Sequence, residues 1–411
     1  MLLPSSFKKP MAILMVLLLG VAGCSNVRES SIYEAKDVNH VQVKAYNDFA
    51  LHLADKLLKE SSGENLFISP LSITFALSLV LNGAEGGTRA ELQQALGVEG
   101  MTLEALNKGN EVLTDLLTYE DTEVELKIAN GLWARKETPL LDSYTDTLKK
   151  SYKVKVKTLD FEDEGSAKTI NNWVKKNTDG RIEEIVEPSL LKSNVLLLAN
   201  AIYFNGTWSK PFEESFTRKV PFYLADGTEE TVQMMMQTTV LSYKETESFK
   251  AVRLPYGSGV WDMVVVLPNE GQTLTEMAPQ LLSQSDEWRE GFVEGKAIVE
   301  LPRFQLKYNN SLKDTLQLLG VKSAFDSAAA DFSAMTGKTS GLFITDVLHK
   351  SFIEVNEHGT EAAAVTSVMM AGSAPAPDKP FQINVNRPFF FAIEDHTTGS
   401  IVFMGTVFNP E

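Results

Sequence analysis

Few side chains in this chain have the types and spacing that chemistry needs. The 411 residues include one cysteine, Cys24, and five histidines: His40, His52, His349, His358 and His396. No histidine stands in a recognisable nucleophile setting, no Gly-x-Ser-x-Gly elbow occurs, and no His, Cys and carboxylate residues cluster at metal-ligand spacing. "TGKTSG" at 336–341 ends like a phosphate loop, but Phe332 stands where its leading glycine should be. We therefore predict no enzyme, cofactor or metal ion, unless a catalytic triad assembles across the fold.

A stretch near the C-terminus is unusual because its side chains are so small. Residues 359–372 read "GTEAAAVTSVMMAG" without a proline, and prolines follow at positions 375, 377 and 380. In a strand, Thr360, Ala362, Ala364 and Thr366 would share one face, and Glu361 would lie on the opposite, solvent-facing side. No backbone donor is missing, so the stretch could join a sheet as a strand. The run of alanines could instead form a short surface helix.

Longer patterns indicate the elements that would hold this stretch. Tyr46, Phe49, Leu53 and Leu57 have the spacing of an amphipathic helix. A second helix should begin with Ser69 as its cap and Pro70 at its first position, and a third at the capping box of residues 88–91. Strands are predicted within 124–136, 194–204, 262–268, 296–304 and 342–356. The chain is therefore predicted to be α+β, with large, mostly antiparallel sheets.

Charge and composition limit the partners. The formal net charge is −16 and no stripe rich in lysine and arginine occurs, which argues against nucleic acid and against a heparin site. The chain is 44% hydrophobic, and no linker or repeat divides it after residue 45. We therefore expect one large domain, residues 43–411, acting as a monomer.

The N-terminus has the pattern of a targeting segment. Lys8 and Lys9 precede an apolar run that ends in "VAGC" at 21–24, which resembles the bacterial lipobox. We expect residues 1–23 to be a lipoprotein signal peptide, Cys24 to carry the lipid, and residues 24–42 to form a tether. An ordinary secretory peptide is the alternative. The protein would then be exported and anchored to the cell envelope, in the outer membrane if the cell has one.

Motifs along the chain resemble those of the serpin family. They include "NLFISPLSI" at 65–73, "LLLANAIYFNGTW" at 196–208, "LPRF" at 301–304, "DVLHKSFIEVNEHGTEAAAVTS" at 346–367 and "FMGTVFNP" at 403–410. The resemblance runs from about residue 43 to the C-terminus. It implies the serpin fold: three mostly antiparallel β-sheets, about eight or nine helices and an exposed reactive loop at about 357–380.

The resemblance also implies a role for the small-residue stretch. In serpins it is the hinge of a loop that a protease cuts, and the part upstream of the cut inserts into the main sheet as a new strand, which traps the protease as an acyl-enzyme. The hinge residues by this resemblance are Glu357, Gly359, Thr360, Glu361, Ala362, Ala363, Ala364 and Thr366. Thr360 would become buried early during insertion.

Two supporting sites follow from the same resemblance. A shutter beneath the sheet would comprise Ser69, Ser72, Asn200 and His349, with His349 bonded to Asn200. A breach, where insertion begins, would comprise Trp208, Thr217, Arg303 and Glu357, with an ion pair between the last two.

The cut bond follows from a count along the loop. In inhibitory serpins the residue before the cut usually lies seventeenth when the hinge glutamate is counted first, which gives Ser373 followed by Ala374. Met370 followed by Ala371 is the runner-up. No Lys or Arg lies between Gly359 and Asp378, so a trypsin-like pocket should reject the loop. We expect elastase-like or subtilisin-like serine proteases as targets, with papain-like cysteine proteases as a further class. The alternative function is a non-inhibitory serpin that binds, stores or chaperones.

Overall fold

The computed structural model describes residues 31–61, 63–118, 123–192, 194–338, 341–361 and 379–410. Residues 31–411 form one compact unit. The described ranges contain eleven α-helices: α1 (His40–Ser61), α2 (Pro70–Gly83), α3 (Gly86–Leu96), α4 (Leu103–Leu117), α5 (Asp142–Tyr152), α6 (Glu164–Asn177), α7 (Pro188–Lys192), α8 (Leu274–Ser283), α9 (Asp286–Arg289), α10 (Lys313–Leu318) and α11 (Ser333–Thr336). Three short 3₁₀ helices are η1 (Ala35–Asp37), η2 (Glu214–Phe216) and η3 (Ser323–Phe325). None of the helices in these ranges is long and apolar enough to span a membrane.

The strands form two sheets in the described part of the chain. A nine-stranded sheet contains β1 (Leu66–Ile68), β5 (Arg218–Tyr223), β6 (Glu229–Glu245), β7 (Phe249–Tyr256), β8 (Trp261–Pro268), β9 (Val293–Pro302), β13 (Phe381–Asn384), β14 (Phe389–Asp395) and β15 (Ser400–Val407). A six-stranded sheet has the order β10 (Phe304–Ser311), β11 (Leu348–Asn356), β12 (Gly359–Thr360), β4 (Leu196–Thr207), β2 (Val124–Arg135) and β3 (Lys155–Leu159).

The α+β class and the serpin fold are confirmed, with two differences in the count of elements. The long strand β6 pairs with β5 at one end and with β7 at the other, so the described strands form two sheets where the resemblance implied three. Four of the eleven helices in the described ranges, α7, α9, α10 and α11, have six residues or fewer. Single turns of this kind carry no hydrophobic period that a sequence pattern could show.

The predicted helix starts were partly right. Tyr46, Phe49, Leu53 and Leu57 all lie on the buried face of α1. Ser69 caps α2 by accepting a hydrogen bond from the Ser72 amide, with Pro70 at the first position. The capping box at 88–91 is wrong, because α3 begins at Gly86.

The residues of that expected capping box serve other contacts. The Thr88 hydroxyl accepts from the Asp331 amide, and the Glu91 carboxylate accepts from the amides of Lys322 and Ser323. These side chains therefore fix loops that are distant in sequence.

The predicted strands were also placed correctly with two exceptions. The stretch 296–304 is broken at Arg303, where β9 ends and β10 of the other sheet begins. Of the stretch 342–356, only Leu348–Asn356 is a strand, namely β11. The six residues before it approach as irregular chain, because Val347 and Ile344 bond to Leu312 and Ala324 instead of to a neighbouring strand.

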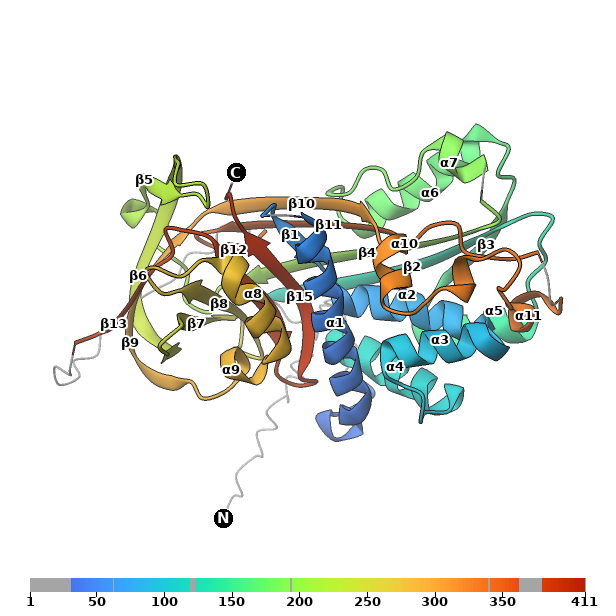
Figure 1. Ribbon diagram of the computed structural model, residues 1–411, viewed down its shortest axis with the longest axis horizontal. Coiled ribbons are helices and arrows are strands. Elements are labelled where there is room, and N and C mark those ends of the chain that lie inside the picture. The colour runs from blue at the N-terminus through green and yellow to red at the C-terminus, as the bar shows by residue number, and fades with distance from the viewer. Residues whose placement is uncertain are drawn as a thin grey trace, which may run out of the picture. The chain divides into compact units, whose positions relative to one another are not determined.

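Helices cover both faces of the six-stranded sheet (Figure 1). On the outer face, α6 and α7 pack with Trp133, Ile170, Val174 and Leu197 in a separate apolar cluster. On the inner face, α2 lies between this sheet and the main core. Anything that enters the sheet must therefore fit between α2 and the cover formed by α6 and the chain that follows it.

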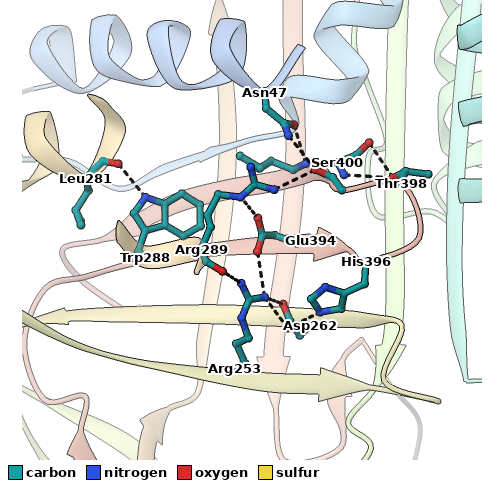
Figure 2. A network of polar contacts seen from close by, with 12 residues as sticks. Asn47, Arg253, Asp262, Leu281, Trp288, Arg289, Glu394, His396, Thr398 and Ser400 are labelled. Carbon is teal, nitrogen blue, oxygen red and sulfur yellow. Dashed lines mark hydrogen bonds and ion pairs between the residues drawn. The ribbon is translucent and has the colours of Figure 1, made fainter. Parts of the chain in front are cut away.

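A cluster of buried charges ties α9 to the nine-stranded sheet (Figure 2). Arg253 on β7 donates two hydrogen bonds to Asp262 on β8, at 2.8 and 2.9 Å, and lies 3.1 Å from Glu394 on β14. Arg289 on α9 bonds to the other oxygen of Glu394, and His396 lies 2.8 Å from Asp262. Both carboxylates are 4% exposed, so each depends on these partners for its charge.

Candidate functional site

The first residues of the predicted hinge already lie inside the six-stranded sheet. β12 pairs antiparallel with β11 on one side, where Thr360 faces Val355, and with β4 on the other, where Thr360 faces Gly206. β4 and β11 are parallel to each other, and in the described residues they pair directly at one position, His349 with Asn200. Between that pair and β12, the two strands are separate. The sheet therefore has a position for a further antiparallel strand between β4 and β11. β12 occupies the end of that position next to Thr207 and Asn356.

Glycine at two positions makes this close approach possible. Gly359 has φ of +145°, and a Cβ there would lie 2.0 Å from the carbonyl oxygen of Gly206. A Cβ on Gly206 would in turn lie 2.8 Å from the ring of Tyr256. A larger residue at either position would force β12 away from β4.

Thr360 is buried before any cut has occurred. Its side chain is 1% exposed, and its hydroxyl lies 2.6 Å from the hydroxyl of Tyr256. The Tyr256 ring stacks on Trp208 with 4.2 Å between ring centroids. The sequence led us to expect this burial during insertion, but the pocket beneath β12 already holds Thr360 in the uncut chain.

The predicted breach residues meet around Glu357, next to the start of β12. Arg303 donates to Glu357 Oε1 from two nitrogens, at 2.8 and 2.9 Å, and the Thr217 hydroxyl donates to the same oxygen. Burial by itself would raise the pKa of the Glu357 carboxyl, but the bonds from Arg303 and Thr217 outweigh it and hold the pKa below its usual value. The Nε1 of Trp208 donates to the Asn356 carbonyl at 3.0 Å. The hinge therefore begins at a fixed point.

The predicted shutter residues also lie together, but their bonds differ from those expected. His349 and Asn200 are opposite each other in register, yet no hydrogen bond joins their side chains. His349 Nε2 accepts from the Ser69 amide at 3.2 Å, and Asn200 donates to Asn130 at 2.5 Å. Burial lowers the pKa of His349 to about 4, which keeps its imidazole neutral and able to accept.

Two shutter oxygens have no hydrogen-bond partner in the described part of the chain: Asn200 Oδ1 and Ser72 Oγ. Ser69, by contrast, donates its hydroxyl to the Val402 carbonyl at 2.8 Å. One buried shutter group on β4 and one on α2 are thus left unsatisfied where the two central strands meet.

Glu361 differs most from its expected environment. We predicted a solvent-facing side chain, but it is 1% exposed, because the chain after α6 covers the outer face of the sheet. Glu361 has φ of +58° and is hydrogen-bonded to Tyr203, with Arg181 Nε 3.3 Å from Oε2. Burial raises the pKa of its carboxyl to about 7.

Several predicted site residues lie outside the described residues. These are Cys24, the hinge residues Ala362, Ala363, Ala364 and Thr366, and both candidate cut bonds, Ser373 with Ala374 and Met370 with Ala371. Among the residues that are described, sequence reasoning missed Tyr256, Tyr203 and Arg181 as hinge contacts. Tyr256 is the last residue of β7, which ends in "LPY" at 254–256, but nothing in these three residues indicates a bond to Thr360.

In the described residues, the sheet thus holds two residues of an antiparallel strand between two parallel strands. Comparison with known proteins identifies the family. The family model described as serpin (serine protease inhibitor) matches residues 44–410, and the chain belongs to the serpin family.

Relatives and solved structures span almost the whole chain. Human serpin B3 is 36% identical over 375 residues, covering 86% of this chain and 95% of that protein. The human leukocyte elastase inhibitor is 35% identical over 376 residues, covering 88% of this chain and 97% of that protein. The native crystal structure of the thermophilic serpin tengpin aligns with a TM-score of 0.79 and 30% identity, covering 89% of this chain and 94% of that one. Inhibitors among its relatives support protease inhibition as the activity of this chain.

Proposed function

We propose that this protein inhibits serine proteases by inserting its cut loop into the six-stranded sheet, where the acylated protease is carried along and trapped. The observation that supports this most is the position of β12, which runs antiparallel between the parallel strands β4 and β11. A chain that continues in the direction of β12 would enter the space between them. The protein would act as a substrate that stays covalently bound to the protease after the cut, and not as a catalyst.

The register of β12 specifies where each hinge residue would go. Since Thr360 faces Gly206 and Val355, each further residue moves one position down β4 and one down β11. By this count Thr366 would reach the level of Asn200 and His349, the single pair that joins the two strands directly in the described residues. Insertion would therefore require that this pair separates.

The faces of the sheet suit the hinge side chains. Phe204 and Ile202 on β4 and Ile353 on β11 point into the core at the positions that Ala362 and Ala364 would face. Small, uncharged side chains can occupy that buried row without an unpaired polar group. His349 is neutral and accepts one hydrogen bond, from the Ser69 amide. Breaking that bond costs less free energy than separating a buried ion pair would.

The target class follows from the loop sequence. We propose a cut between Ser373 and Ala374 by an elastase-like or subtilisin-like protease, with Met370 and Ala371 as the runner-up bond. The name of one relative, leukocyte elastase inhibitor, agrees with such a target. A trypsin-like enzyme would find no basic residue between Gly359 and Asp378.

The test is to incubate the protein with elastase-like, subtilisin-like, chymotrypsin-like and trypsin-like enzymes and to look for a covalent complex on denaturing gels. We expect a complex with at least one of the first two and none with the trypsin-like enzyme. The C-terminal fragment released from the complex should begin at Ala374 by intact mass, or at Ala371 for the runner-up bond. Degradation without a complex by all four enzymes would show a non-inhibitory serpin.

We also propose that the protein is a monomer held to the cell envelope by a lipid on Cys24. The lipobox-like "VAGC" at 21–24 supports this, since several acyl chains on one residue anchor stably. Replacing Cys24 by Ala should move the protein out of the membrane fraction or leave it as an unprocessed precursor. A variant that fractionates and migrates like the original protein would exclude the anchor.

A further inference from the structure

Two glutamates come together where β12 ends. The Glu361 amide donates to the Glu354 carbonyl at 3.1 Å, so Glu361 occupies the next position opposite β11 although it is not part of the strand. Glu354 lies on the outer face of the sheet, because its neighbours Ile353 and Val355 are buried in the core. In an extended hinge Glu361 would face Glu354 directly, and like charges at such positions destabilise a sheet.

Arg181 lies between the two carboxylates. It belongs to the chain between α6 and α7, and its Nε is 3.3 Å from Glu361 Oε2 while its Nη1 is 3.8 Å from Glu354 Oε2. Its guanidinium lies over the ring of Phe352 on β11, 5.5 Å from the centroid, which fixes it on the outer face of the sheet. A planar guanidinium with several donors can serve two carboxylates at once, which a compact ammonium does less well.

Two other cations lie nearby. Lys307 on β10 lies over the same Phe352 ring, 6.0 Å from its centroid, and forms no ion pair with either glutamate among the described residues. Lys127 on β2 lies 2.8 Å from Asp179 and 3.0 Å from Glu125, and 5.3 Å from the Tyr203 ring centroid. Tyr203 on β4 is hydrogen-bonded to Glu361, but it is neutral. Among the described residues, Arg181 is the cation that forms ion pairs with both Glu354 and Glu361.

We propose that Arg181 is a positioning residue for loop insertion: it bridges Glu354 and Glu361, which must lie opposite each other when the hinge extends the sheet, and thereby favours insertion over release of the cut loop. This inference rests on the proposed inhibitory function. It assigns the segment after α6 a part in the first step of insertion, beyond covering the sheet.

The surroundings of Glu361 determine how pH should act on this bridge. When the hinge lies between β4 and β11, here called the seated hinge, burial raises the pKa of the Glu361 carboxyl to about 7, above its ordinary value of 4.5 in water. The seated hinge therefore binds a proton more readily than a released one, and falling pH favours it. Without Arg181 the pKa should be higher still, so protonation should replace the lost cation.

The experiment compares Arg181→Gln with Lys175→Gln, a matched loss of one charge on α6, where Lys175 is 52% exposed and pairs with Glu183. Hydrogen exchange of the Glu361 amide in the uncut protein reports the seated hinge independently of any protease. At pH 8 we expect the protection factor of this amide to fall about tenfold in Arg181→Gln, which corresponds to one pKa unit of lost interaction, and to recover at pH 6. Lys175→Gln should behave like the original protein.

The second readout is the number of inhibitor molecules consumed per protease trapped. Arg181→Gln should raise this number at pH 8, and the double variant Arg181→Gln with Glu354→Gln should restore it, because the facing like charge is gone. Equal behaviour of Arg181→Gln and Lys175→Gln in both readouts, or no rescue by Glu354→Gln, would overturn the proposal. If the original protein forms no covalent complex, the inhibitory function fails, and the exchange experiment still decides whether Arg181 holds the hinge.

Discussion

Glu357 fixes the position of the chain just before β12. It is 2% exposed, and it stays charged because Arg303 and Thr217 donate to it. An isolated buried carboxylate would instead take up a proton. Because Arg303 is 44% exposed, water screens the ion pair, and we expect it to contribute only about 1 kcal/mol to stability. Its main effect is positional: it sets where the chain turns into β12.

A single substitution at Thr360 should leave the loop open to cutting by a protease but prevent the protein from trapping that protease. The buried hydroxyl of Thr360 is bonded to the Tyr256 hydroxyl, which is neutral because burial raises its pKa, and which therefore offers no negative charge to a guanidinium. In Thr360→Arg, seating an unpaired cation would cost several kcal/mol, so the hinge should stay out of the sheet. We expect the variant to be cut in the loop but to form no covalent complex on denaturing gels.

The matched control is Thr360→Val, which keeps the shape and loses the hydroxyl bond. Its cost should be about 1 kcal/mol, and inhibition should persist. Full inhibition by Thr360→Arg would contradict the insertion mechanism.

For single residues, the sequence predicted which side chains lie close together better than it predicted their hydrogen-bond partners. Motif resemblance grouped Arg303, Glu357 and Thr217, and the structure brings them into contact. It also paired His349 with Asn200, whose side chains lie opposite each other but bond elsewhere. The difference has a physical reason, because register depends on the strand pattern, whereas side-chain bonds depend on other segments. His349 accepts from Ser69 at the start of α2, and Asn200 donates to Asn130 on β2.

At the scale of elements, the strand pair β4 and β11 matters more than any side chain. The sequence predicted β4 from its apolar run, which is typical of a strand buried on two faces. β11 instead alternates buried and half-buried residues, and the prediction began it six residues too early. The seated position of β12 could not be predicted, since it depends on space left by Gly206 and on the ring of Tyr256. Alternation alone placed Glu361 in solvent, and it could not show that the chain after α6 covers that face.

Gly359→Ala tests whether β12 belongs to the sheet in the uncut protein. The new Cβ would lie 2.0 Å from the Gly206 carbonyl oxygen, a backbone atom that cannot rotate away. We expect β12 to leave the sheet and the Glu361 amide, now bonded to the Glu354 carbonyl, to exchange faster. Gly227→Ala is the control. Gly227 also has a positive φ, but a Cβ there would meet no atom within 4 Å. Unchanged exchange in Gly359→Ala would show that β12 is not held by this contact.

At the scale of the whole molecule, the charge cluster of Figure 2 should make stability depend on pH. The hydrogen bond with Asp262 raises the pKa of His396, and burial raises that of Asp395 to about 6. A group whose pKa is raised by folding stabilises below its unfolded pKa and loses that contribution as pH rises through the folded value. For His396 that loss begins above about pH 6.5. The melting temperature should therefore fall between pH 6 and 8.

His396→Gln isolates the histidine's share of this effect. We expect its melting temperature to vary less between pH 6 and 8, by about 1–3 °C, because the glutamine carries no charge to lose. The residual slope would come from Asp395 and from Glu361, whose carboxyl pKa is about 7. His52→Gln, at an exposed position of α1, is the control. If both variants keep the full slope, His396 does not titrate as its contact with Asp262 implies.

If the cut loop inserts as proposed, we expect the uncut fold to be less stable than the cut one. Among the described residues, β4 and β11 lack a neighbour along the space between them, and a loop that fills it would gain backbone bonds worth about 0.5–1.5 kcal/mol each on both sides. Ordering each residue would cost about 1–2 kcal/mol, so the gain depends on pairing with both strands and on burying the side chains that face the core. Over six or more residues we expect the melting temperature of the cut protein to rise by about 10 °C or more, measured by calorimetry at a fixed scan rate. Thr360→Arg, cut in the same loop, should show no such rise because its hinge stays outside. An unchanged melting temperature after cutting the original protein would mean that the space between β4 and β11 is not filled, and the trapping mechanism would lose its driving force.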